Sequence, residues 1–179
     1  MTRILHRVAV LLSLAGTAAG AQGITTEFHG ELNGVQKKII DLAAAMPETS
    51  YDWRPGPGVR SVREVYMHVI ADNYYIAALL GKPAPAATGI GADYATASAY
   101  EKKALTKAQI GAELTASFSV LHQAFGLTTE ANASQKIKFF GGDVTRSAAE
   151  MGTIGDLHEH LGQSIAYARM NKVVPPWSK

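Results

Sequence analysis

Apolar residues recur at steps of three and four along four separate stretches of this chain, and this pattern constrains the fold most strongly. Such a spacing places the apolar side chains on one face of an α-helix, whereas a half-buried strand would need strict alternation. The helices are expected at about 26–46, 62–80, 106–125 and 147–170. Amphipathic helices bury their apolar faces against one another, so the sequence predicts an all-α, four-helix bundle, not necessarily with up-down-up-down topology.

The residues expected in the core follow from these four stripes. They are Phe28, Leu32, Val35, Ile39, Leu42 and Met46; Val62, Val65, Val69, Ile76 and Leu80; Ile110, Leu114, Phe118 or Ser117, Leu121 and Phe125; and Ile154, Leu157, Leu161, Ile165 and Ala168. The chain contains no cysteine, which excludes a disulfide scaffold, a thiolate zinc site and a cysteine nucleophile. The core alone must therefore stabilise the fold.

Several residues mark the expected helix ends. Ser61 followed three residues later by Glu64 forms a capping box at the start of the second helix, and Gly81 suits its end. Thr106 is expected to cap the third helix. The two Pro-Gly pairs within 51–58 exclude a helix there, so this segment is expected to form a turn or extended arm that Trp53 pins to the bundle.

The connections between the helices are long. A loop is expected at 82–96, a short helical turn at 98–105, and a long crossover at 128–146. Within that crossover, 136–140 alternates weakly and favours a short extended piece. A non-helical tail is expected after the fourth helix.

The first residues have the pattern of a secretory signal peptide. Arg3 and Arg7 precede an uncharged apolar run at 8–18, and Ala19-Gly20-Ala21 has the small residues of a cleavage site. The sequence predicts a signal peptide at 1–21, a domain at 22–179, and a periplasmic or secreted location. The alternative is an uncleaved anchor, although the apolar run is shorter than the ~20 residues that a spanning helix needs.

Charge argues against a nucleic-acid partner. Cleavage after residue 21 removes two of the 17 basic residues and none of the 15 acidic ones, so the mature chain is close to neutral. Nucleic-acid binding then lacks its electrostatic basis. The expected partner is a small-molecule substrate, with no membrane contact after signal cleavage. The chain has neither a Gly-x-Ser-x-Gly elbow nor a glycine-rich phosphate loop.

Two pairs of residues at helical spacing are candidates for a divalent-metal site. His68 and Asp72 share a face of the second helix, and Asp156 and His160 share a face of the fourth. His68 with Asp156 and His160 would supply two imidazoles and one carboxylate, which leaves coordination positions open for water or substrate. His158 lies on the opposite flank of the apolar stripe and has no carboxylate partner at this spacing. The alternative is a pair of hydrogen-bonded, partly buried histidines.

Two segments resemble the DinB-like family, and in particular its exported members. The aromatic and proline-rich turn at 51–62 leads into the helix bearing His68, and 158–163 with Tyr167 resembles the last bundle helix, which reads H-x-x-x-H-x-G-Q. The resemblance covers about 24–179. It implies a four-helix bundle and a three-ligand site for a divalent metal, often nickel, zinc or iron. His68 and His160 match family ligands.

Asp156 stands where the family motif has its first histidine, so this chain departs from the pattern. The site would then consist of two histidines and one carboxylate, or the metal would be lost. The resemblance implies a metal-dependent transferase or hydrolase of unknown substrate. The alternative is a non-catalytic periplasmic protein that binds a metal or small ligand, or that forms a homodimer through its helix faces. Nothing in the sequence decides whether the protein is an enzyme.

Overall fold

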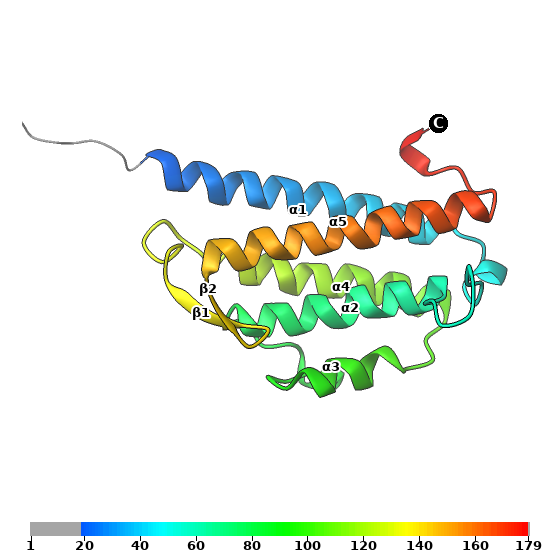
Figure 1. Ribbon diagram of the computed structural model, residues 1–179, viewed down its shortest axis with the longest axis horizontal. Helices are drawn as coiled ribbons and strands as arrows, with labels where there is room; N and C mark the ends of the chain where they lie inside the picture. The colour runs from blue at the N-terminus through cyan, green and yellow to red at the C-terminus, as the bar shows by residue number, and fades with distance from the viewer. Residues whose placement is uncertain (1–18, 179) are drawn as a thin grey trace, which may run out of the picture.

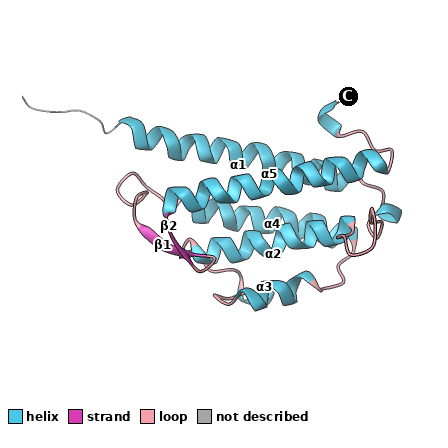
Figure 2. Cartoon of the chain, viewed as in Figure 1, coloured by secondary structure: helices cyan, strands magenta, loops and turns pink. Residues whose placement is uncertain are grey.

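The computed structural model describes residues 19–178, and four long helices make up most of it (Figures 1 and 2). They are α1 (Ala19–Ala45), α2 (Val62–Leu79), α4 (Lys107–Phe125) and α5 (Arg146–Met170). Helix α1 packs against α4 and α5, and α2 packs against the same two helices from the other side. The predicted all-α bundle is confirmed. The predicted signal peptide lies outside the described residues except for 19–21.

The short helix α3 (Tyr94–Glu101) explains why two of the four long helices that follow one another in the chain run in the same direction. The colours of Figure 1 show that α2 and α4 run in one direction and that α1 and α5 run in the other. Helix α3 lies against the outer side of α2 and carries the chain back before α4 begins. Because α3, α4 and α5 all cover α2, every residue of α2 from 65 to 77 is buried.

The core occupies the space between the four long helices, as the apolar stripes predict. Every residue of the predicted stripes is buried except Phe28 and Ile165, which are partly buried against the core. The burial of α2 on all sides also encloses polar residues, among them His68, Asp72 and Asn73. Buried polar side chains need hydrogen-bond or ion-pair partners, so neighbouring elements must supply such partners to this face of α2.

The helix ends agree with most of the sequence signals. Ser61 and Glu64 form the predicted capping box, and Thr106 caps α4 in the same manner. Gly81 follows α2 in a left-handed conformation with φ +98°. Two expectations were wrong by several residues: α1 begins at Ala19 rather than near 26, and α3 occupies 94–101 rather than 98–105 because Asp93 caps it.

A β-hairpin stands in the long crossover before α5. Strands β1 (Lys136–Phe139) and β2 (Gly142–Thr145) pair antiparallel, and the hairpin packs against α2 and α5. The extended piece expected at 136–140 is present, but its partner strand was not predicted because Gly-Asp-Val-Thr lacks a clear apolar alternation. Phe140 and Gly141 form the two-residue turn with φ +46° and +81°.

The segment between α1 and α2 is an ordered arm. It opens with a 3₁₀ turn (Glu48–Ser50) and contains Trp53, which packs edge-on against Tyr167 of α5 with ring centroids 5.4 Å apart. The Tyr167 hydroxyl donates to the carbonyl oxygen of Arg60 at 3.1 Å. The expectation that Trp53 pins the arm is confirmed, and these contacts fix Arg60 beside the start of α2.

The remaining short elements are 3₁₀ turns at Ala86–Thr88 and Pro176–Ser178. Among the described residues, no helix combines the length and the hydropathy needed to cross a membrane.

Candidate metal centre

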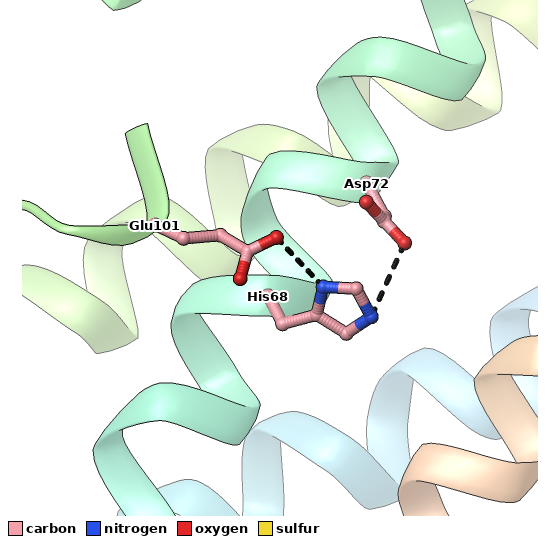
Figure 3. Close-up of side chains that lie close together, drawn as sticks. All are labelled: His68, Asp72 and Glu101. Atoms are coloured by element: carbon pink, nitrogen blue, oxygen red, sulfur yellow. Dashed lines mark hydrogen bonds and ion pairs between the residues drawn. The ribbon is translucent and has the colours of Figure 1, made fainter. Parts of the chain in front are cut away.

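His68, on the buried helix α2, contacts a carboxylate through each of its ring nitrogens (Figure 3). Nδ1 lies 2.8 Å from Oε1 of Glu101, at the end of α3, and Nε2 lies 3.4 Å from Oδ2 of Asp72. Asp72 was expected beside His68 from its helical spacing. Glu101 was not predicted, because it comes from a different helix whose position against α2 is a matter of tertiary packing.

Helix α5 brings the second imidazole to the same place. The rings of His68 and His160 meet edge to face with centroids 4.7 Å apart, and Nε2 of His160 lies 3.5 Å from Oδ1 of Asp156. The three residues proposed from the sequence are therefore neighbours in space. His158 is half-exposed instead, with its Nε2 3.7 Å from Glu31 of α1. Metal binding by His68, Asp156 and His160 itself stays a prediction.

A second set of donors overlaps this one. His68, Asp72 and Glu101 each offer an atom suited to a metal ion, and these atoms lie within 4.8 Å of one another. The two sets share His68, so the groups around this side chain comprise two imidazoles and three carboxylates. Imidazoles and carboxylates together suit divalent ions of the first transition series.

The contact with Glu101 assigns the role of Nδ1 of His68. Arg60 lies 3.5 Å from Oε2 of Glu101 and favours its ionised form. An ionised carboxylate can only accept, so Nδ1 of His68 donates to Glu101, although the Arg60 guanidinium also lies 3.3 Å from this nitrogen. A carboxylate that holds the distal N–H in this way is the usual support of a metal-bound histidine.

Nε2 of His68 faces Oδ2 of Asp72 at 3.4 Å, and this contact needs either a proton or a cation between the two atoms. In addition, Oδ1 of Asp72 is buried and has no hydrogen-bond partner among the described residues. A buried carboxylate oxygen without a partner is costly. Both observations fit a divalent cation held between Nε2 and Asp72.

The pKa shifts around the site reflect the crowding of acidic groups. Burial raises the pKa of Asp72 to about 6; the positive charge of His68 opposes this shift, and the charges of Asp156 and Glu101 add to it. Burial also acts to raise the pKa of Glu101, but the hydrogen bond and charge of His68 and the charge of Arg60 outweigh it, so this pKa is lowered. The acidic groups thus favour positive charge at the centre.

The pair on α5 titrates as an ion pair. Burial acts to raise the pKa of Asp156, yet the hydrogen bond and charge of His160 lower it overall. Burial acts to lower the pKa of His160, and the hydrogen bond and charge of Asp156 raise it overall. A metal ion would therefore compete with a proton for His160.

A cavity of about 290 Å³ opens beside these residues. His68, Asp72 and Asp156 form its polar side, and Tyr94, Phe139 and Phe140 are among the residues of its apolar side. This volume is close to the lower limit for sites that hold small molecules. The donor groups thus stand at the edge of a space large enough for a small ligand.

Comparison with known proteins identifies the family. The model of the DinB superfamily matches residues 31–164. This chain belongs to the DinB superfamily. The resemblance to the DinB-like family inferred from 51–62 and 158–163 is thereby confirmed. The match tests neither the metal site nor export. No curated protein matches the chain.

Solved structures, two of them of DinB-like proteins, share the fold. A DinB-like protein from Bacillus cereus ATCC 10987 is 16% identical with a TM-score of 0.66, over 87% of this chain and 95% of that one. A conserved protein from Enterococcus faecalis is 18% identical with a TM-score of 0.64, over 81% and 95%. A DinB-like protein from Bacillus subtilis is 16% identical with a TM-score of 0.60, over 85% and 94%. At these identities the likeness concerns the fold alone.

Proposed function

We propose that this DinB-superfamily protein binds one divalent metal ion between α2 and α5, with His68 and His160 as imidazole ligands and Asp156 and Asp72 as carboxylate ligands. The observation that carries the proposal is the meeting of His68 and His160, whose rings lie 4.7 Å apart although the residues belong to distant segments of the chain. The carboxylates around them supply the negative charge that a cation needs.

The residues around the two imidazoles have separate roles in this proposal. Glu101 holds Nδ1 of His68 and thereby turns Nε2 toward the ion. Arg60 keeps Glu101 ionised, and the Trp53–Tyr167 contact and the Tyr167 hydrogen bond keep Arg60 in place. A bound divalent ion would lower the pKa of a water or thiol ligand and so supply a nucleophile near neutral pH.

The reaction that suits such a site is transfer to, or hydrolysis of, a small molecule. Nickel, zinc and iron are the metals proposed, because a mixture of imidazoles and carboxylates suits them. Export would favour hydrolysis, since low-molecular-weight thiol cosubstrates are characteristic of the cytoplasm. The near-neutral mature chain supports a small-molecule partner over a nucleic acid.

The test is the metal content of untagged protein after equilibration with nickel, zinc or ferrous ion and removal of the excess. Wild type is expected to retain about one ion per chain, and His68→Ala and His160→Ala are expected to retain less than a tenth of that. His158→Ala is the matched control, because His158 lies on the same helix but faces Glu31. Equal amounts of retained metal in all four proteins would contradict the proposed ligands, and a wild type that retains no metal would favour a non-catalytic helical module.

We also propose that the chain is exported and that residues 1–21 are removed. The support is the basic start, apolar run and small residues at 19–21. Intact-mass analysis of protein recovered outside the cytoplasm is expected to give a chain beginning at Gln22. A product that retains Met1 in that fraction would contradict cleavage.

A further inference from the structure

The cavity beside the candidate metal centre has an apolar wall that the metal proposal does not use. Four aromatic residues from three elements build it: Tyr75 of α2, Tyr94 of α3, and Phe139 and Phe140 of the hairpin. Phe140 lies 5.6 Å from Tyr75, 6.1 Å from Tyr94 and 4.9 Å from Phe139, measured between ring centroids. Tyr94, Phe139 and Phe140 line the cavity, and the buried Tyr75 packs against the rings of Tyr94 and Phe140.

Two of these rings are unusually exposed for their size. Phe140 is 52% exposed and Tyr94 is 40% exposed, although both contact other aromatic rings. Exposed aromatic side chains gathered at the edge of a cavity mark a binding surface more often than scattered apolar residues do. The cluster therefore provides an apolar face that a ligand could cover.

The backbone at Phe140 points to the same conclusion. Its φ of +46° is a left-handed conformation, which a two-residue hairpin turn requires and which asparagine or glycine adopts at lower cost. A phenylalanine at this position breaks the local preference, and its ring is half-exposed rather than buried in the core. Such departures from local preference are concentrated at functional sites.

The polar side of the cavity restricts the chemical groups that a bound ligand can place there. Asp72 and Asp156 line it, and Oδ1 of the buried Asp72 has no hydrogen-bond partner among the described residues. An anionic group cannot approach these carboxylates unless a cation lies between. A cavity of about 290 Å³ exceeds the ~150 Å³ that holds a benzene ring, so it has room for one ring and a short polar substituent.

We propose that the ligand of this site is a small monocyclic aromatic compound whose oxygen-donor substituent, such as a carboxylate, amide or ester, reaches the metal centre while its ring packs against Phe140 and Tyr94. Phe140 is then the residue that sets specificity for the ring. This inference rests on the proposed metal site, and it adds the class of substrate.

The experiment compares two metal-chelating probes on the metal-loaded mature chain by calorimetry. Acetohydroxamate and benzohydroxamate share the chelating group and differ in the ring. Wild type is expected to bind benzohydroxamate at least ten-fold more tightly, because only this probe buries a ring against the aromatic wall. In Phe140→Asn this preference is expected to fall below two-fold, while the affinity for acetohydroxamate is unchanged.

Asparagine suits the turn, so Phe140→Asn is expected to fold with an unchanged or higher melting temperature. Asp143→Asn is the matched control, since Asp143 lies on the same hairpin and pairs with Lys138 at the surface. It is expected to retain the full preference for benzohydroxamate.

The outcomes separate the two proposals. Equal affinities of wild type for both probes would overturn the aromatic ligand and leave the metal site intact. A large loss of melting temperature in Phe140→Asn would also overturn it, because the ring would then be structural. Failure of both probes to bind a chain that holds metal, or the absence of bound metal, would refute the open metal site and the aromatic ligand with it.

Discussion

Glu150 is the residue of the described core whose polar atoms are least well paired. It is fully buried near the start of α5, where the Thr128 hydroxyl and the charge of Arg146 only partly offset the cost of burying its carboxylate. Arg146, one turn earlier, donates instead to the Leu80 carbonyl at 2.7 Å and to the Thr128 hydroxyl at 3.3 Å. Burial raises the pKa of Glu150, so the folded state favours its protonated form.

This shift predicts a pH-dependent stability. Because the pKa of Glu150 is higher in the folded state than in the unfolded state, the folded chain binds more protons between the two values, and its stability decreases as pH rises through that range. Glu150→Gln cannot titrate. Relative to wild type, its free energy of unfolding should increase as pH rises through the range in which Glu150 loses its proton, so the variant should be the more stable protein at neutral pH.

Urea unfolding at a series of pH values measures this difference. A stability difference between variant and wild type that stays constant with pH, or a variant that is less stable at neutral pH, would contradict a net cost of burying the ionised carboxyl.

Residue spacing in the sequence predicts which site residues are neighbours only when both lie on the same helix. The pairs His68–Asp72 and Asp156–His160 follow from the i, i+4 rule, and both pairs are in contact. The choice between His158 and His160 could not be made from the periodicity, since both flank the stripe. Glu101 gave no signal at all, because only the docking of α3 on α2 brings it to His68.

At the scale of elements, α3 is the piece that lies outside the four-helix core and yet completes the site. It delivers Glu101 to His68 from one end and Tyr94 to the cavity from the other. The sequence predicts a short helix in this region four residues too late, because Asp93 caps the helix within a stretch whose Ala, Gly and Pro content favours a loop. The second hairpin strand was missed for a related reason, since its pairing with 136–139 and not its own pattern makes it extended.

The role of α3 predicts the effect of Glu101→Gln. The amide has the same shape but carries no charge, so it holds Nδ1 of His68 less firmly, and metal affinity is expected to fall about 10-fold or more. Glu159→Gln is the control, because it removes one negative charge from an exposed position on α5. Competition with a chromophoric chelator measures both affinities.

An equal loss of metal affinity in Glu101→Gln and Glu159→Gln would mean that net charge alone governs this affinity. Unchanged affinity in Glu101→Gln would contradict the positioning role. The melting temperature of the metal-free variants serves as the check that both retain the fold.

At the scale of the whole molecule, the topology is what brings the two imidazoles together. Helices α2 and α5 are neighbours in the bundle although α3, α4 and the hairpin separate them in sequence. The amphipathic stripes were sufficient to predict the bundle and its core, because each stripe needs burial regardless of the order of helices. They did not fix the order or direction of the helices, which depends on the long connections.

The most direct test of this account is anomalous scattering from crystals of the metal-loaded protein. One ion is expected within about 2.0–2.2 Å of Nε2 of both His68 and His160. Asp156 and Asp72 should supply the carboxylate ligands of the same ion. An anomalous peak elsewhere, or loaded crystals in which the two rings remain in edge-to-face contact with no ion between them, would contradict the metal centre.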